Sequence, residues 1–158
     1  MFETLFTLIV AALAFAALGF GTLIVPNAGE GKLLEIMVNK TASANCTLFL
    51  YSNNATLSNA TVLGDLTEVS GGGYAAATLT GATWGVTPGS PSVLLYGAEQ
   101  VFTFTSVPGT ATVYGYGVKV GTTLLWAEAL PSAPFTVAAA GDAVKVTPRF
   151  TLASVSAD

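Results

Sequence analysis

From Cys46 onward the sequence repeats one pattern, in which short segments rich in β-branched and aromatic residues are separated by glycine, proline, asparagine or serine. Such segments predict β-strands joined by turns. The eight segments are CTLFLYS (46–52), YAAATL (74–79), VFTFT (101–105), TVYGYGVKV (112–120), TLLWAE (123–128), FTV (135–137), AVKVT (143–147) and RFTLA (149–153). Eight or nine strands at intervals of roughly 8–12 residues predict a mainly β fold, an antiparallel β-sandwich of jelly-roll type.

The segment TVYGYGVKV shows the clearest alternation, and successive side chains of a strand point to opposite faces. The residues expected to share one face are Tyr114, Tyr116, Val118 and Val120, and those on the opposite face are Val113, Gly115, Gly117 and Lys119. Gly121 follows, and a strand pattern resumes at Thr123. The pattern therefore predicts a hairpin whose loop centres on Gly121.

The N-terminal part of the chain is a single apolar run. Thr4 to Val25 spans 22 residues, which as a helix would be about 33 Å long, against a bilayer hydrocarbon core of roughly 30 Å. Small residues recur at a spacing of four, which lets helix backbones approach closely. The residues that we predict to act in assembly are Phe6, Leu8, Ala12, Leu13, Ala16, Ala17 and Gly21.

The residues that flank this run leave three interpretations open. Only Glu3 is charged before it, so the basic start of a secretory signal is missing. The nearest basic residues, Lys32 and Lys40, follow the run and would place the body of a membrane protein on the cytoplasmic side. The segment is therefore a helical arm buried in a protein assembly, a membrane helix through residues 4–25, or a signal that is removed.

A second helical pattern follows the break at Pro26. In residues 30–40, EGKLLEIMVNK, Leu33, Leu34, Met37 and Val38 recur at helical spacing. These residues predict an amphipathic helix that covers one edge of the β-domain. We therefore divide the chain into an apolar N-terminal helical arm, residues 1–22, and a β-sandwich domain, residues 23–158, that includes the short helix 30–40.

The chain carries unusually little charge. Charged residues make up 9% of the sequence, against roughly 25% in typical globular domains. So little charge indicates that other subunits or lipid cover much of the surface. The loops at 52–61, 70–73 and 87–92 carry no charge and are expected to lie against neighbours as well. A net charge of −4 with no basic cluster argues against a nucleic-acid partner.

The residue types on which most catalysis depends are scarce. The chain has no histidine, and its one cysteine, Cys46, therefore has no histidine to activate it and is expected to pack inside a strand. Asp65 and Glu68 are expected to lie in a solvated turn rather than to bind a cation. An aromatic carbohydrate platform built from Tyr114, Tyr116 and Trp126 is less consistent with the alternation than core packing. The sequence thus predicts no enzyme, no cofactor and no metal site.

From Val25 to Leu152 the sequence resembles small structural virion proteins of tailed bacteriophages. The matching segments occur in the same order as in those proteins. They are VPNAGEGKLLEIMVN, TLFLYSNN, LTEVSGGGYAAATLTGATW, EQVFTFT, TVYGYGVKVGTTLLWAEAL and GDAVKVTPRFTL. The tyrosine-glycine hairpin followed by LLWAE and GDAVKVTP is the most specific part. No catalytic signature belongs to this resemblance.

The resemblance implies a virion location and a non-enzymatic role as a capsid decoration or cement protein, or as a small tail component. The implied partners are further copies of the chain, with a trimer favoured, and other virion proteins such as the major capsid protein. One alternative is an extracellular filament subunit, because Phe6 to Ile9 resemble the start of a type IV pilin, although Val10 replaces that family's glutamate. The other alternative is a membrane-anchored binding module.

Overall fold

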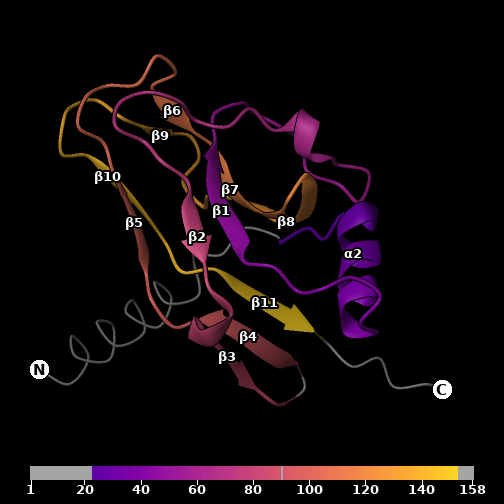
Figure 1. Cartoon of the computed structure of the whole chain (residues 1–158). Helices are drawn as coiled ribbons and strands as arrows, with labels where there is room; N and C mark the ends of the chain where they lie inside the picture. The colour runs from indigo at the N-terminus through magenta and orange to yellow at the C-terminus, as the bar shows by residue number, and fades with distance from the viewer. Residues whose placement is uncertain (1–22, 90, 153–158) are drawn as a thin grey trace, which may run out of the picture.

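The computed structural model describes residues 23–89 and 91–152 (Figure 1). It contains one α-helix, two short 3₁₀ helices and eleven strands in these ranges. The elements are α2 (Asn27–Met37), β1 (Cys46–Tyr51), η1 (Leu63–Asp65), β2 (Ala77–Leu79), η2 (Gly81–Thr83), β3 (Trp84–Thr87), β4 (Ser92–Tyr96), β5 (Gln100–Thr103), β6 (Thr112–Val113), β7 (Gly115–Val120), β8 (Thr123–Ala129), β9 (Phe135–Thr136), β10 (Ala143–Val146) and β11 (Arg149–Leu152). The prediction of a mainly β fold with antiparallel sheets is confirmed.

The largest sheet has four strands in the order β2-β1-β7-β8, and all of its pairs are antiparallel. The predicted hairpin joins β7 to β8, with Val120 opposite Thr123 and Gly121 in the loop. Gly121 has a φ of 57°, a left-handed conformation that costs glycine little because it has no Cβ. The hairpin prediction is therefore confirmed, together with the position of its loop.

The other strands pair in a nested order along the chain. β4 pairs with β11, β5 with β10, β6 with β9 and β7 with β8, and every pair is antiparallel. β3 adds to the outer side of β4, so that β3 and β4 form a hairpin at one end of the molecule (Figure 1). The sequence pattern missed both of these strands, because glycine and proline surround them.

Helix α2 begins and ends three residues earlier than the sequence predicts. Pro26 occupies the N-cap position in an extended conformation, and Asn39 leaves the helix with a φ of 57°. The helix packs against β8 at the edge of the large sheet, and a Cβ at Gly29 would lie 2.3 Å from the Leu125 carbonyl oxygen. Only a glycine permits this close approach. Together with the bridge between Ile24 and Ala127, the helix covers the free edge of β8 and protects it from pairing with other chains.

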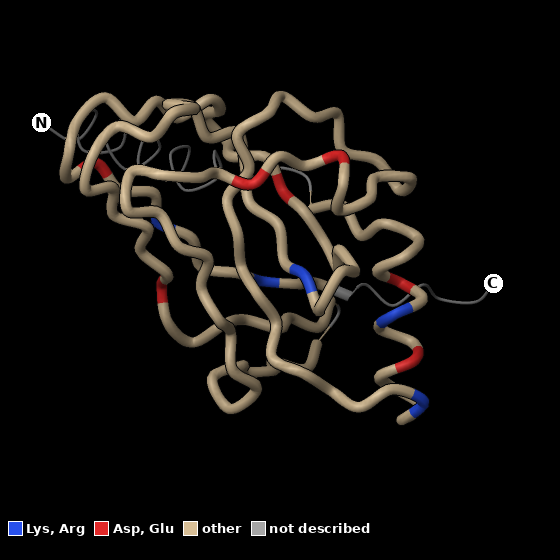
Figure 2. The backbone as a smooth tube through the Cα atoms, turned by 45° about the horizontal axis from the view of Figure 1, so that its top comes forward, with Lys and Arg blue, Asp and Glu red and all other residues tan. Residues whose placement is uncertain are grey.

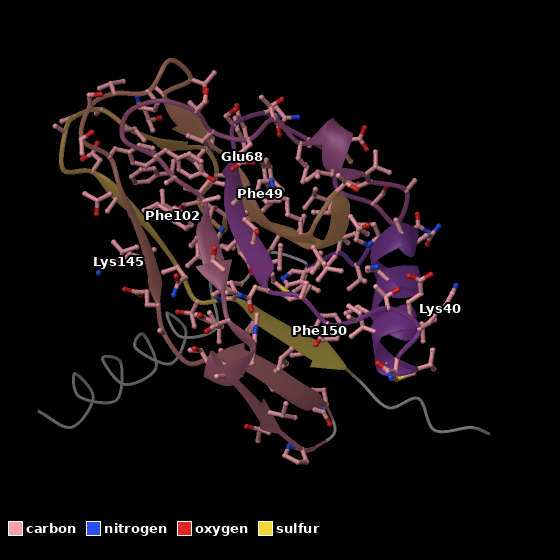
Figure 3. The ribbon with its side chains drawn as sticks, viewed as in Figure 1. Lys40, Phe49, Glu68, Phe102, Lys145 and Phe150 are labelled. Carbon is pink, nitrogen blue, oxygen red and sulfur yellow. The ribbon has the colours of Figure 1, made fainter. Side chains whose placement is uncertain are left out.

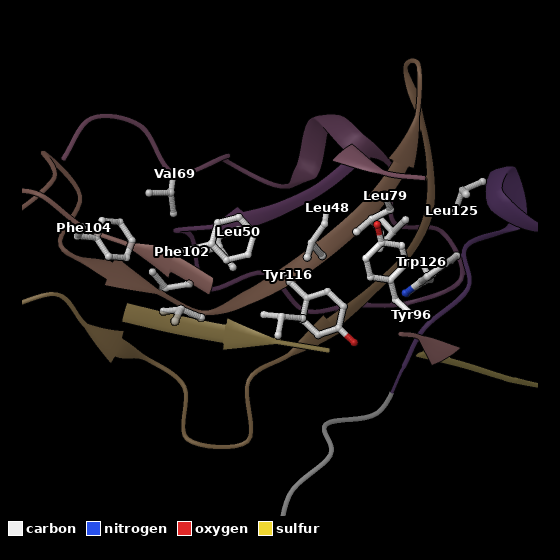
Figure 4. Packing of buried hydrophobic residues seen from close by; sticks show 14 of the residues in the cluster. Leu48, Leu50, Val69, Leu79, Tyr96, Phe102, Phe104, Tyr116, Leu125 and Trp126 are labelled. Atoms are coloured by element: carbon white, nitrogen blue, oxygen red, sulfur yellow. The ribbon is translucent and has the colours of Figure 1, made fainter. Parts of the chain in front are cut away.

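Two hydrophobic cores lie on the two faces of the large sheet. The main core contains side chains of β1, β7 and β8 on one side and of β5 and β10 on the other (Figure 4); the residues labelled there are Leu48, Leu50, Val69, Leu79, Tyr96, Phe102, Phe104, Tyr116, Leu125 and Trp126. The smaller core contains Phe49 and Tyr51 on the opposite face. Ala55 and Leu57 cover that face, so this part of the uncharged 52–61 loop packs on its own domain.

The predicted alternation is wrong at Tyr114. This residue lies between β6 and β7, and it packs on the smaller core whereas Tyr116 and Val118 belong to the main core. Val113, expected on the face opposite Tyr116, belongs to the main core as well. The break between the two strands shifts the pattern by one residue, and a shift of one residue moves every following side chain to the other face.

Candidate functional site

The most concentrated polar site within the described residues surrounds the carboxylate of Glu128 on β8. Only 4% of Glu128 is exposed, and its Oε2 accepts a hydrogen bond from the hydroxyl of Tyr116, the residue opposite it on β7. The backbone carbonyl of Glu128 accepts a second bond, at 3.4 Å, from the hydroxyl of Tyr51. Tyr116 and Glu128 line a cavity of about 110 Å³ together with Lys145 and Arg149.

This arrangement is suited to holding strands together. Small-molecule sites usually enclose about 300–1,000 Å³, and the cavity beside Glu128 is much smaller. The carboxylate is already engaged by the hydroxyl of a paired strand. A buried carboxylate is costly unless hydrogen bonds compensate for its lost hydration. We therefore interpret the Tyr116–Glu128 pair as a cross-strand polar contact that fixes the register of the β7–β8 hairpin.

The hydroxyls of Tyr51, Tyr74 and Tyr116 give the fold a specific response to alkaline pH. Burial, with Glu128 nearby, raises the pKa of Tyr51 to about 12. Burial also raises the pKa values of Tyr74 and Tyr116, and the carboxylates of Glu68 and Glu128 add to the effect. Tyrosine hydroxyls in the unfolded chain have a pKa near 10. Between this value and the raised pKa values of the folded state, the unfolded state releases protons that the folded state retains.

The contribution of these hydroxyls to the free energy of unfolding should therefore be fully present below about pH 10. It should be lost as the pH rises from about 10 toward 12. Near-ultraviolet circular dichroism and tyrosinate absorbance, followed through an alkaline titration, should change together. The Tyr51→Phe variant removes one of the three hydroxyls and should move the transition to higher pH. A folded spectrum that persists at about pH 12, with the tyrosines ionised, would contradict this prediction.

The acidic pair Asp65 and Glu68 has structural partners. Asp65 Oδ2 accepts the Val62 N–H at 2.8 Å at the start of η1. Glu68 Oε2 lies 3.0 Å from Lys119 Nζ, which in turn lies 4.9 Å from the centre of the Phe49 ring; Figure 3 shows Glu68 and Phe49 next to each other. Among the described residues, no group of three or more His, Cys, Asp or Glu side chains could hold a metal ion.

The second candidate site is an apolar groove between helix α2 and the β3–β4 hairpin, which we name the α2 groove. It has a volume of about 200 Å³. Leu33 and Ile36 of α2 form one wall, and Trp84 and Leu94 of the hairpin form the other. The remaining lining residues come from the body of the domain and are Ser43, Ala44, Cys46, Leu79, Gly81, Val120, Leu125 and Trp126.

Exposed apolar side chains lie on the two elements that form the walls of this groove. On α2 and just beyond it, Leu34, Met37 and Val38 are 57%, 73% and 67% exposed, although the sequence predicts that they pack against the domain. On the hairpin, Val86 and Leu95 are exposed as well. No charged residue occurs between Glu68 and Glu99, and Figure 2 shows this long uncharged part of the backbone in tan. The α2 groove and the exposed Leu34, Met37, Val38 and Val86 are therefore a candidate contact surface. Leu95 follows Leu94 in β4, so it lies on the opposite face of the hairpin.

The sequence-predicted site residues fall in two groups. The seven assembly residues, Phe6, Leu8, Ala12, Leu13, Ala16, Ala17 and Gly21, belong to residues 1–22 and lie outside the described part of the chain. The aromatic residues Tyr116 and Trp126 are buried, at 6% and 3% exposure, so they form no exposed carbohydrate platform. The sequence analysis did not identify the α2 groove, because its walls come from segments about fifty residues apart.

Comparison with protein-family models, curated proteins and solved structures finds no match for this chain. Within the described residues, no helix combines the length and the hydropathy that a bilayer span requires.

Proposed function

We propose that this protein is a non-enzymatic structural protein of a virion, a capsid decoration or cement protein that stabilises the shell through subunit–subunit contacts. The observation that carries the proposal is the apolar lining of the α2 groove, together with the exposed apolar side chains on the two elements that form its walls. A soluble monomer rarely exposes such a surface, whereas an assembled subunit buries it against its neighbours. The segments from Val25 to Leu152 that resemble structural proteins of tailed bacteriophages favour a virion over other assemblies.

The proposal includes a sandwich of jelly-roll type. The nested pairs β4–β11, β5–β10, β6–β9 and β7–β8 are the pairs obtained when one long hairpin is rolled up. Jelly rolls are common among viral capsid domains. This order of pairing therefore supports both the proposed topology and the proposed location.

The proposal assigns the role of an assembly arm to residues 1–22. We infer a closed cluster of subunits, with a trimer favoured, in which the arms are buried between copies or between the cluster and the major capsid protein. Burying apolar surface contributes about 25 cal/mol per Å². A run as apolar as residues 4–21 would on that scale stabilise each contact by several kcal/mol.

The proposal is tested by locating the protein in the cells that produce it. A lysate is separated on a density gradient, and the fractions are probed for the protein and for nuclease-resistant DNA. The protein should sediment with intact phage particles and remain with them after washing. Recovery in the membrane fraction, or with filaments sheared from the cell surface, would contradict the proposal and favour the corresponding alternative.

A further inference from the structure

We propose that the α2 groove is the receptor for residues 4–21 of a second copy of this chain. The inference rests on the proposed function, since it names the partner and the contact through which the subunits assemble. It depends on three observations: the firmly packed indole in the wall of the groove, the size and apolar lining of the groove, and the composition of the N-terminal segment.

The first observation concerns Trp126, which lines the groove. Within the described residues, its Nε1 is the buried side-chain polar atom that has no hydrogen-bond partner. The indole ring itself is held firmly between two aromatic side chains. Its centre lies 6.1 Å from that of Trp84 and 5.7 Å from that of Phe150. This atom has less than 1 Å² of accessible surface and is closed off from the groove, so the indole contributes a rigid apolar wall to it.

The second observation is the shape of the surface. The groove of about 200 Å³ is smaller than the roughly 300–1,000 Å³ of typical small-molecule sites. It can take a few apolar side chains of a longer segment, while the exposed Leu34, Met37 and Val86 can contact the rest of that segment. Apolar grooves beside a helix commonly bind partner segments in this way.

The third observation identifies the occupant. Residues 4–21 contain no charge, and their only polar side chains are the hydroxyls of Thr4 and Thr7. The segment offers large apolar residues such as Phe6 and Leu13 for the groove. The segment is thus complementary to the apolar lining of the groove.

The N-terminal segment is long enough to reach the groove of a neighbouring subunit. The described part of the chain starts at Leu23, and the next residue is already bound to strand β8. Ile24 exchanges two backbone hydrogen bonds with Ala127, at 2.9 and 3.0 Å. Eighteen residues span about 27 Å as a helix and roughly 60 Å when extended, which is enough to reach a neighbouring subunit. Each copy supplies one segment and one groove, so the contact can close into a symmetric ring.

The first test fills the groove with a side chain. Gly81 lines the groove, and a Cβ at this position would meet no heavy atom within 4 Å. The Gly81→Leu variant should therefore remain folded but show, by light scattering, the 16.0 kDa mass of one chain. Gly64→Leu is the matched control, because Gly64 also lies in a 3₁₀ helix with open space but does not line the groove. This control should keep the mass of the unaltered assembly.

The second test identifies which copy supplies the segment. Cys46 is the only cysteine of the chain and lines the groove. A chain with Ala12→Cys and Cys46→Ala is mixed with the unaltered chain, so that a disulfide with Cys46 can form only between copies. We expect a disulfide-linked dimer under mild oxidation. An acceptor chain with Cys46→Ala and the exposed Thr56→Cys should give no dimer.

The outcomes separate this inference from the proposed function. An assembly whose mass Gly81→Leu leaves unchanged, without the Cys46 dimer, would overturn the groove as receptor, even if the protein still sediments with phage particles. A third chain, with Ala12→Cys alone and Cys46 kept, tests the chain's own segment. A disulfide within that chain, without the dimer in the mixture, would also overturn the inference in favour of the chain's own segment. Loss of mass in Gly81→Leu together with the dimer would support the inference, whatever particle the assembly belongs to.

Discussion

Replacing Trp126 with alanine should lower the free energy of unfolding by about 3–5 kcal/mol. The indole is 3% exposed and packs against Trp84 and Phe150 from two other strands. Its removal leaves a cavity that joins the α2 groove, and the rigid strands around it cannot collapse to fill the space. Urea unfolding followed by circular dichroism, at one fixed protein concentration, measures the change.

The Trp126→Phe variant is the control for this loss. It keeps an aromatic ring in the core but removes an N–H that has no partner within the described structure. The loss of stability should therefore be much smaller than in Trp126→Ala. An alanine variant that unfolds at the urea concentration of the unaltered protein would show that the indole is not part of the core.

Removal of Met1 to Gly21 should have the largest effect on assembly and almost none on folding. The described residues from Leu23 onward contain both hydrophobic cores, and helix α2 and Ile24 already cover the edge of β8. The shortened chain should keep the circular dichroism spectrum and the melting temperature of the body but remain a single subunit. Circular dichroism and sedimentation velocity measure the two properties on the same sample.

A shortened chain that fails to fold would place the apolar segment in the domain core and would make the division at residue 22 wrong. A shortened chain that still assembles would remove the arm from the proposed function. Deleting the C-terminal residues 154–158 is a suitable control, because it shortens the chain at the other end and should leave the assembly intact.

The sequence predicted most of the strands because their signal is local. All eight predicted segments overlap strands, and the hairpin at Gly121 is in the predicted place. The exceptions are β3 and β4. Trp84 to Tyr96 is interrupted by Gly85, Pro88, Gly89 and Pro91, and such residues are typical of turns. In the fold, the proline residues lie between the two strands and the paired backbones on either side supply the hydrogen bonds.

The long-range features could not be read from local patterns. The spacing of apolar residues around Leu34 and Met37 correctly predicted a helix. However, α2 contacts β8 through Gly29 and leaves those two side chains exposed. Glu128 was one charge among nine acidic residues, and its partner Tyr116 is defined only by the register of the hairpin. The α2 groove likewise depends on how segments distant in the chain pack together.

The most direct test of the assembly account is the molar mass of the full-length protein, extracted without detergent and measured by light scattering. We expect a soluble particle with a discrete mass that is a small multiple of 16.0 kDa. Such a mass would mean that protein buries the apolar segment. Protein that stays with the membranes and is released only by detergent would contradict the account, because lipid would then cover residues 4–25.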